Sequence, residues 1–325
     1  MEYPKAVECK GSCIPQTEDM AAKVTEHPCY SKDAHFKFGR IHVPVAPRCN
    51  IQCNYCTRKF ACPNENRPGV TTKVISPDQA VTTIREAIEK EPRLKILGVA
   101  GPGDALDNPA TLETFAKAGE AFPFLTRCLS TNGLLLPDMI EDIDRVGITT
   151  LTITINAVDP DIGEKIYSHI RYRGKTYKGR EAFEILNRNQ LEGLRQAAMR
   201  GMVVKVNSVL IPGINDHHLV EVARVVKALG AYILNVIPMI PLAKFEHIMP
   251  PSDDEVNRIR DECASVIQQF RNCMRCRADA IGIPGEEGCG GEAESSDAES
   301  SNKVCTPKFL QEKPIARLQA KGETV

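Results

Sequence analysis

Six short apolar segments alternate with amphipathic helical patterns along most of this 325-residue chain. Such alternation predicts a parallel β-sheet whose strands are connected by helical crossovers. One helical pattern begins after Ser76, a candidate N-cap residue, with Pro77 at the first helical position and apolar side chains on one face. The expected strands are 41–45, 94–100, 125–130, 149–155, 203–210 and 232–237, and the expected helices are 76–90, 110–121, 137–146, 181–200, 216–229 and 252–271.

The polarity of two of these strands favours a barrel over an open sheet. In residues 150–156 (TLTITIN), aliphatic and polar side chains alternate, so one face of the strand is apolar and the other polar. Lys205 and Asn207 give the strand 203–210 a polar face as well. Strands of an open α/β sheet are usually apolar on both faces, whereas a polar face can line an interior that holds a ligand. We therefore expect an α/β fold, an incomplete (β/α)6 TIM-like barrel, in residues 41–284.

The unusual sequences of the chain follow the expected strands. The carboxyl ends of parallel strands share one mouth, where α/β proteins bind ligands. Gly and Pro also simply mark turns, and this stays the alternative reading for any single loop. Taken together, the loops predict a ligand site at the mouth of the barrel. The segments are 49–56, 101–104 (GPGD), 131–133 (TNG), Asn156, 212–216 (PGIND) and 238–241 (PMIP).

Thirteen cysteines without an N-terminal apolar segment indicate metal or redox chemistry rather than a secreted disulfide scaffold. Cys49, Cys53 and Cys56 have the spacing C-x3-C-x2-C within one loop. A four-iron cluster held by three thiolates keeps one iron open for a small chelating ligand. Zinc is the alternative, with Cys62 as a fourth ligand. The net charge of −1 gives no general field for a polyanion, and no apolar segment is long enough for a membrane span, so neither nucleic acid nor a membrane is an expected partner.

The cysteine spacing, with Tyr55 directly before the last cysteine, resembles the signature of the radical S-adenosylmethionine (SAM) enzymes. This resemblance implies a [4Fe–4S] cluster at Cys49, Cys53 and Cys56, whose open iron binds the amino and carboxylate groups of SAM. It also implies that the glycine-rich GPGD segment receives the SAM amino group, since Gly permits a close approach. The residues implied for SAM binding besides Tyr55 are Gly101, Gly103, Asp104, Asn132, Thr152, Thr154, Asn156 and Ile211.

A second resemblance spans residues 27–283 and is more specific. Similarity to the NifB family of radical SAM proteins, which act in nitrogenase cofactor assembly, is carried by HPCYSKDAHFKFGRIHVPVAPRCNIQCNYCTRKFACPNENRPGV, GPGDALDNP, STNGLLLP, TITINAVDP and CMRCRADAIG. This resemblance implies that two [4Fe–4S] clusters, called K1 and K2, are substrates. They would be fused around a carbide from a SAM methyl group, with another sulfur added, into an eight-iron precursor of the iron–molybdenum cofactor.

The NifB resemblance also implies cluster ligands outside the signature. Period two places Cys128 on the same strand face as Ser130, toward the barrel interior, although a single such thiol is more often a buried apolar residue. The C-x2-C pair near the C-terminus has a redox disulfide as its alternative reading. Glu65 is a candidate for transient iron binding or proton transfer, or else an ordinary solvated loop carboxylate. The assigned ligands are His27, Cys29, Cys62 and Cys128 for K1, and Cys263, Cys273 and Cys276 for K2.

Three regions follow from this assignment: a leader with cluster ligands (1–40), the partial barrel with a C-terminal cluster-binding segment (41–284) and an acidic low-complexity tail (285–325) expected to be disordered. Some NifB proteins carry a C-terminal carrier domain, and we expect this chain to be a short form without one. The implied partners are iron–sulfur cluster donors, an electron donor such as ferredoxin, and downstream carrier or scaffold proteins, in an anaerobic cytoplasm. The expected non-ligand cysteines are Cys9, Cys13, Cys289 and Cys305.

Two other functions stay open. Another radical SAM enzyme with auxiliary clusters, of the peptide-modifying or molybdopterin-pathway type, would keep those clusters intact. A non-catalytic iron–sulfur carrier would need no SAM site. Cleavage of SAM by the reduced protein therefore separates the carrier from both kinds of enzyme.

Overall fold

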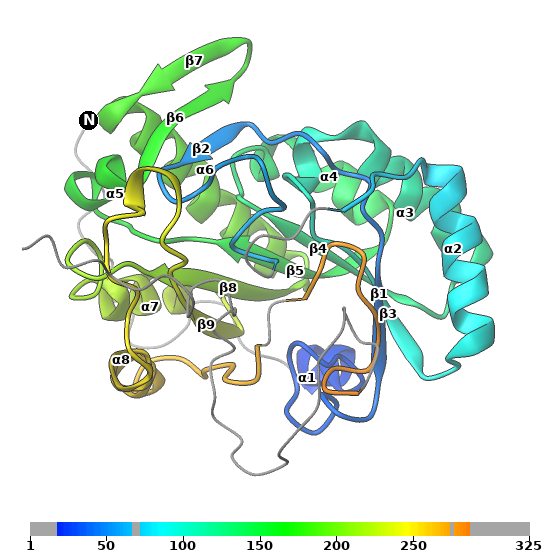
Figure 1. Cartoon of the computed structure of the whole chain (residues 1–325). Coiled ribbons are helices and arrows are strands. Elements are labelled where there is room, and N and C mark those ends of the chain that lie inside the picture. The colour runs from blue at the N-terminus through cyan, green and yellow to red at the C-terminus, as the bar shows by residue number, and fades with distance from the viewer. Residues whose placement is uncertain (1–17, 67–71, 274–275, 287–325) are drawn as a thin grey trace, which may run out of the picture. The chain divides into compact units, whose positions relative to one another are not determined.

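A curved sheet with six parallel strands forms the centre of the structure, as the alternation of apolar segments predicts (Figure 1). The strand order is β1-β3-β4-β5-β8-β9, and a short strand, β10 (Ile281–Gly282), pairs with β1 in the antiparallel direction. Among the described residues, β9 and β10 are the two edges, so the expected incomplete (β/α)6 barrel is confirmed. β1 lies slightly before its expected position, because Pro44 has no N–H for a strand ladder. The parallel strands are β1 (Gly39–His42), β3 (Leu94–Val99), β4 (Thr126–Thr131), β5 (Ile148–Thr154), β8 (Val203–Leu210) and β9 (Ile233–Pro238).

The computed structural model describes residues 18–66, 72–273 and 276–286. These residues belong to one unit of the chain, Met1–Ser295, and a second unit, Ser296–Val325, lies outside them. Within the described ranges, no helix is both long and apolar enough to cross a lipid bilayer. Almost all of the expected acidic tail lies outside the described residues, as do Cys9, Cys13, Cys289 and Cys305.

Helices follow the parallel strands at the positions that the sequence predicts. The N-cap prediction for Ser76 is confirmed: its hydroxyl accepts the Gln79 N–H at 3.2 Å, and the Gln79 side chain accepts the Ser76 N–H at 2.9 Å. Apolar faces of these helices, including Ile84 and Phe115, pack with the outer face of the sheet in the main core. The helices are α2 (Pro77–Lys90), α3 (Pro109–Ala121), α4 (Leu136–Arg145), α6 (Gly179–Met199), α7 (Leu219–Ala228) and α8 (Asp253–Ala264).

The end of α8 differs from the prediction. The helix stops at Ala264 instead of continuing to residue 271. The following backbone runs along the edge of β9 and exchanges hydrogen bonds with it. The Leu234 N–H donates to the Gln268 carbonyl at 2.9 Å, and the Phe270 N–H donates to the Leu234 carbonyl at 2.8 Å. Pairing with an open sheet edge therefore replaces the helix here.

A second sheet, of three antiparallel strands, was not predicted (Figure 1). Its first strand lies inside the cysteine-rich loop and is too short to show an alternating pattern. The other two form a hairpin whose turn residues, Arg173 and Gly174, have φ values of 48° and 75°, as a type I′ turn requires. The elements that the sequence analysis missed are α1 (Glu18–Val24), β2 (Ile51–Cys53), η1 (Ala105–Asp107), α5 (Pro160–Ile166), β6 (Tyr167–Tyr172), β7 (Lys175–Lys178), η2 (Ala243–Phe245) and β10 (Ile281–Gly282).

Candidate functional site

The signature loop, residues 49–56, is held by donors directed at its backbone carbonyls. The Arg58 guanidinium donates to the carbonyl of Cys49 at 2.8 Å and to the carbonyl of Ile51. Arg171, on β6, donates to the Cys49 carbonyl at 2.9 Å. The missed antiparallel sheet therefore has a role, because it brings a second arginine to this loop and fixes its backbone.

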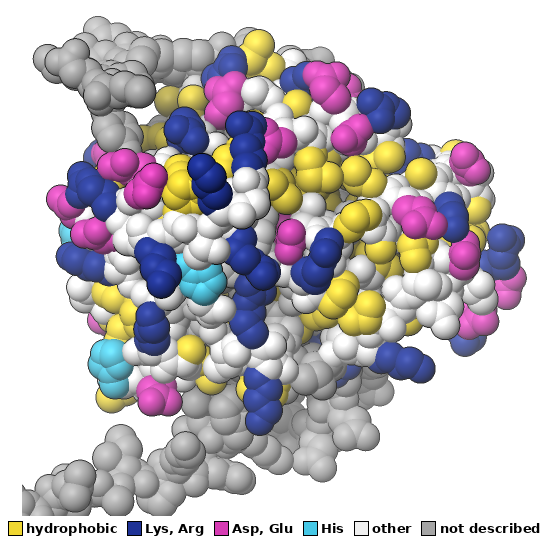
Figure 2. All heavy atoms as spheres, turned by 90° about the horizontal axis from the view of Figure 1, so that it is seen from above, with side chains coloured by type: hydrophobic (Ala, Val, Ile, Leu, Met, Phe, Trp, Pro, Cys, Tyr) yellow, Lys and Arg dark blue, Asp and Glu magenta, His cyan; other side chains and the backbone are white. Residues whose placement is uncertain are grey.

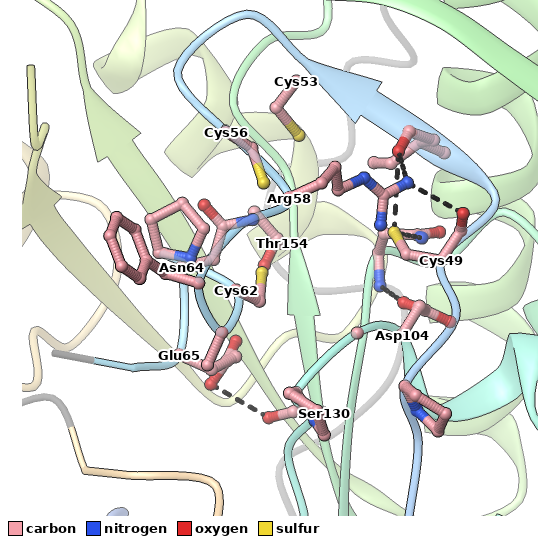
Figure 3. Close-up of a pocket in the computed structure, with 18 of the residues that line it drawn as sticks. Cys49, Cys53, Cys56, Arg58, Cys62, Asn64, Glu65, Asp104, Ser130 and Thr154 are labelled. Atoms are coloured by element: carbon pink, nitrogen blue, oxygen red, sulfur yellow. Dashed lines mark hydrogen bonds between the residues drawn. The ribbon is translucent and has the colours of Figure 1, made fainter. Parts of the chain in front are cut away.

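A cavity of about 190 Å³ opens beside this loop, and all three signature cysteines line it (Figure 3). Cys62, from the segment after the loop, lines the same cavity. We call the cavity with these four cysteines the signature pocket. It is also lined by Arg58, Asn64, Glu65, Thr72, Gly103, Asp104, Ser130, Asn132 and Thr154.

Burial dominates the electrostatics of the thiols in the signature pocket. It raises the pKa of Cys49 to about 11 and raises the pKa of Cys53 well above its usual value. Metal-free thiols of this kind stay protonated near neutral pH, so a metal centre that binds them must displace their protons. Two other lining atoms, Asn64 Oδ1 and Thr72 Oγ1, are buried without a hydrogen-bond partner in the described part of the chain. The donor set thus fits a thiolate-held cluster beside a polar ligand.

The GPGD segment packs against the loop through its last two residues. The Asp104 carboxylate accepts the Asn132 N–H at 2.6 Å and the Thr131 hydroxyl at 3.0 Å, so it anchors the end of β4. Burial raises the pKa of Asp104 to about 6. A Cβ at Gly103 would lie 2.1 Å from the Arg48 carbonyl oxygen, so only glycine fits. Among the described residues, no group donates a hydrogen bond to the Gly103 carbonyl, which can therefore accept one from a ligand.

The structure divides the residues implied for SAM binding into two groups. Asn156 belongs to the group behind the pocket: its amide donates to the Tyr55 hydroxyl at 2.7 Å, and its side-chain oxygen accepts the Val209 N–H at 2.9 Å. These bonds support the signature loop from within the protein. Gly103, Asp104, Asn132 and Thr154 line the pocket, whereas Tyr55, Gly101, Thr152, Asn156 and Ile211 are not among its lining residues.

A second group of thiols lies against an apolar cluster that includes the rings of Tyr30 and Phe270. Cys29, Cys128 and Cys273 all pack against this cluster. They come from segments far apart in the sequence: the stretch before β1, the strand β4 and the stretch after α8. Only the folded sheet brings them together.

Cys276 joins this group through its charged neighbours. Its sulfur accepts two hydrogen bonds from Arg40 on β1, from Nη2 at 2.8 Å and from Nε at 3.3 Å. Burial raises the pKa of Cys29 to about 12, and Cys276 and Cys128 are close enough to raise it further. We call these four residues the auxiliary thiol site: Cys29, Cys128, Cys273 and Cys276.

The three other residues assigned to K1 and K2 lie apart from this site or beside it. Cys62 is in the signature pocket, and the signature thiols add to the rise in its pKa that burial causes. Cys263 is fully buried in the main apolar core. His27 is buried next to Cys29: its Nδ1 accepts the Cys29 N–H at 3.2 Å, and its Nε2 has no partner within the described residues. Across the described ranges, no three His, Cys, Asp or Glu side chains are arranged to hold a single metal ion.

Glu65 connects the two thiol groups. It lines the signature pocket, and its carboxylate accepts the Ser130 hydroxyl at 3.1 Å and the Asn207 amide at 3.0 Å. Ser130 shares a face of β4 with Cys128, as period two predicts. Burial raises the pKa of Glu65 above its usual value. With both oxygens hydrogen-bonded, Glu65 is not the solvated loop carboxylate that the alternative reading describes.

The sequence analysis missed the arginines that touch the two thiol groups. Arg58 is only two residues past the last signature cysteine, but its side-chain direction depends on a backbone φ of 62°. Arg40 contacts Cys276 across a separation of 236 residues, which no local pattern shows. The polar face of β8 was predicted, and its Asn207 does reach the interior.

The surface above the signature loop is basic. Figure 2 shows Lys and Arg side chains gathered around a histidine on the face that carries β2, β6 and β7. The pKa of His169 on β6 is lowered by burial and then by its cationic neighbours, among them Arg171, Arg58 and Lys178. Because Arg58 and Arg171 also bond to the loop, this basic rim reaches directly to the signature cysteines.

Known proteins resemble the chain both in sequence and in fold. The radical SAM superfamily model matches residues 43–226. The chain is 46% identical over 270 residues to the FeMo cofactor biosynthesis protein NifB of Chlorobaculum tepidum, covering 82% of this chain and 64% of that protein. It is 47% identical over 279 residues to the protein of the same name from Azotobacter vinelandii, covering 83% and 55%. For the one from Methanocaldococcus jannaschii, identity is 44% over 260 residues, covering 79% and 86%.

Among solved structures, the chain is similar to Streptococcus suis SuiB bound to S-adenosylmethionine. The TM-score is 0.51 at 11% sequence identity, over 77% of this chain and 53% of that one. This likeness shows a shared fold. The chain spans between about half and two thirds of the length of the Azotobacter and Chlorobaculum relatives.

Proposed function

The chain belongs to the NifB family within the radical SAM superfamily, and from this premise we propose that it assembles a precursor of the nitrogenase iron–molybdenum cofactor. In this proposal it binds one [4Fe–4S] cluster and SAM in the signature pocket. Two further [4Fe–4S] clusters are substrates, which it fuses around a SAM-derived carbide with an added sulfur. The product is an eight-iron cluster.

One observation supports this proposal: the fold holds two separate groups of thiols, and Glu65 is linked to both. Glu65 lines the signature pocket, and Ser130, which bonds to it, shares a strand face with Cys128 of the auxiliary thiol site. A carrier would need only the thiols, whereas a SAM-dependent enzyme needs a ligand pocket beside one group. The signature pocket supplies that space next to Cys49, Cys53 and Cys56.

The residues of the signature pocket have separate tasks in this reaction. When bound and reduced, the cluster supplies the electron that cleaves SAM. Arg58 and Arg171 fix the loop carbonyls, so that the three thiolates keep their relative positions. The Gly103 carbonyl would accept a hydrogen bond from the ammonium group of SAM. Asp104 positions Asn132, whose side-chain amide donates to Asn50 Oδ1 at 2.7 Å at the rim of the cluster site.

We propose that the substrate clusters are held by ligands that can release them. Cys29, Cys128 and Cys273 have the strongest support because they already lie together. Cys263 has the least support, because its thiol is buried in the main core. His27 can bind iron through Nε2 only after its ring proton moves to Nδ1, which ends the hydrogen bond from the Cys29 N–H. The full proposed sets are His27, Cys29, Cys62 and Cys128 for K1, and Cys263, Cys273 and Cys276 for K2.

Glu65 is proposed to act between the two sites. A carboxylate with a raised pKa can take a proton at one site and release it at the other, or bind iron briefly while a cluster changes its ligands. Its hydrogen bonds from Ser130 and Asn207 would fix its position in either role.

The partners are proposed on chemical grounds. SAM cleavage consumes an electron, so an electron donor must approach the signature pocket, and the basic rim formed by Arg58, Arg171 and Lys178 favours an acidic donor such as a ferredoxin. Cluster donor proteins would load the substrates. Downstream carrier or scaffold proteins would take the product.

The decisive experiment uses SAM labelled with carbon-13 at the methyl group. The reconstituted protein is reduced without oxygen and incubated with labelled SAM and the other assembly factors, and carbon is then released from the isolated cluster by acid. We expect the label inside an eight-iron cluster, and no label when Cys49, Cys53 and Cys56 are replaced by Ala. Consumption of SAM with separate, unlabelled auxiliary clusters would indicate another radical SAM enzyme. No consumption at all would indicate a carrier.

A further inference from the structure

Lys205 is a buried cation at the auxiliary thiol site. Its side chain extends from the polar face of β8, and the residue is only 7% exposed. The ammonium nitrogen lies 5.2 Å from the ring centre of Tyr30 and 5.6 Å from that of Phe270. Among the described residues, no carboxylate lies within ion-pair distance of this nitrogen.

A second buried cation borders the same thiols. Arg40 is 3% exposed and donates two hydrogen bonds to the Cys276 sulfur. The rings that enclose Lys205 belong to the apolar cluster against which Cys29 and Cys128 pack. The four thiols are therefore bordered by two positive groups.

The ammonium group of Lys205 has no carboxylate beside it that balances its charge within the described residues. Glu65 attracts Lys205 through space, but both oxygens of its carboxylate are already bonded to Ser130 and Asn207. Two aromatic faces stabilise an ammonium group but do not replace the water that it loses on burial. An anion that enters the site would therefore give Lys205 a direct partner.

We propose that Lys205 and Arg40 are positioning residues that bind a cluster substrate through its negative charge, an inference that rests on the proposed function. A four-iron cluster with three or four thiolates is an anion. Lys205 acts on the charge of the whole cluster, whereas Arg40 orients one thiolate, Cys276. When a preformed cluster transfers to these thiols, they release their protons to solvent and the cluster keeps its oxidation state. The pair favours an anionic cluster over a bare metal cation, which two positive charges repel.

The test uses the full chain carrying Cys49→Ala, Cys53→Ala and Cys56→Ala, so that SAM chemistry plays no part. After anaerobic transfer of a preformed [4Fe–4S] cluster to the protein, the rate at which a chelator removes iron reports on the auxiliary thiol site. Into this background we would introduce Lys205→Met, Lys205→Arg and, as a control, Lys117→Met. Lys117 pairs with Asp78 and Glu113 on a helical surface.

We expect Lys205→Met to lose iron about tenfold faster than the background, since hydrogen bonds and ion pairs to charged groups are worth about that much. Lys205→Arg keeps the charge and should stay close to the background, as should Lys117→Met. The second readout is the unfolding temperature of the metal-free protein. Here Lys205→Met should raise it, because removal of an unbalanced buried charge stabilises the empty site. A purely structural lysine would give the opposite sign.

Three results would overturn the inference. A background that retains no iron shows that no cluster binds at these thiols, whether or not the intact chain cleaves SAM. Equal iron loss in Lys205→Met and the background removes the role of the lysine while leaving the proposed function intact. A lower unfolding temperature for metal-free Lys205→Met shows that the lysine supports the fold rather than a bound anion.

Discussion

The signature pocket and the auxiliary thiol site both present four cysteines, but they are built differently. Three thiols of the signature pocket come from one loop, and arginines hold the carbonyls of that loop. The auxiliary thiols come from segments separated by most of the chain, and their charged neighbours touch the sulfur itself. A local loop with a fixed backbone suits a cofactor that stays. A site assembled from distant segments can open when one of them moves, which suits a substrate that must leave.

The largest expected difference between the two sites is in SAM cleavage. Cys53→Ala removes a ligand of the only cluster proposed to bind SAM, so formation of 5′-deoxyadenosine should fall to background. Cys128→Ala should lower bound iron by about one cluster while part of the SAM cleavage persists. Chromatographic assay of deoxyadenosine with an iron count on the same samples measures both. Equal losses of SAM cleavage in Cys53→Ala and Cys128→Ala would mean that the two sites are not independent.

The next effect concerns the close packing under the signature loop. Gly103→Ala places a methyl group against the Arg48 carbonyl, so we expect a loss of about 2–4 kcal/mol in the free energy of unfolding and weaker SAM binding. Urea unfolding of the metal-free protein measures the first quantity. The matched control is Gly174→Ala, in the β6–β7 turn, where a Cβ meets nothing within 4 Å and only the φ of 75° opposes it. That change should cost about 1 kcal/mol. Similar costs at both positions would contradict the packing argument.

A pH dependence should appear on the auxiliary side. Burial lowers the pKa of His42 to about 4, below its usual 6.5, and its Nδ1 bonds to the Arg277 carbonyl at 3.1 Å. As the pH falls, His42 is therefore protonated in the unfolded chain at a higher pH than in the folded protein. The stabilising contribution of neutral His42 is therefore complete above pH 6.5 and is lost between about pH 6.5 and 4, by up to about 3 kcal/mol.

His42→Asn isolates this contribution from the other acid-titrating groups. The difference in unfolding free energy between wild type and His42→Asn, measured by urea unfolding at several pH values, should shrink as the pH falls through that window. A difference that is constant with pH would show that His42 does not titrate as its burial predicts.

The smallest effect is expected at the rim of the signature pocket. Arg58→Met removes the donors to the Cys49 and Ile51 carbonyls but leaves the cysteines, so stability should fall by about 1 kcal/mol. Iron should leave the signature pocket faster, and the auxiliary iron should be unaffected. Iron release to a chelator, measured in the Cys128→Ala background for the signature pocket and in the Cys53→Ala background for the auxiliary thiol site, separates the two rates. Lys90→Met, which changes an exposed cation in the last turn of α2, outside the pocket lining, serves as the control and should behave like wild type.

Much of the fold follows from the sequence because its signals are local. Alternating polarity in β5 and the capping box at Ser76 depend on residues within a few positions of one another. The antiparallel sheet was missed because β2 has only three residues and because the Arg173–Gly174 turn lacks the common Asn-Gly sequence. The predicted end of α8 was wrong because the residues after Ala264 form hydrogen bonds with the open edge of the sheet instead of continuing the helix. This edge exists only in the folded protein.

In the candidate site, too, the features with local sequence signals were predicted and those that depend on distant contacts were not. The cysteine spacing identified the signature pocket, and the polar face of β8 indicated a polar interior of the barrel. The contact between Arg40 and Cys276 joins residues 236 positions apart, and only the folded sheet reveals it. The sequence left two places open for Cys62, beside the signature thiols or among the K1 ligands. The Cys62 N–H, which donates to the Pro102 carbonyl at 2.8 Å, helps to hold it beside the signature thiols.

The pairing of β10 with β1 also sets an order of events during synthesis. Arg40 donates to the Gly282 carbonyl at 2.8 Å, across 242 residues, and the thiol of Cys276 is held by the same arginine. The lining of the signature pocket, by contrast, ends at Thr154. Because a chain emerges from the ribosome N-terminus first, the residues that hold the permanent cluster are all made long before Cys276 exists. A nascent chain would therefore be able to acquire its own cofactor before it has a place for the clusters that it processes.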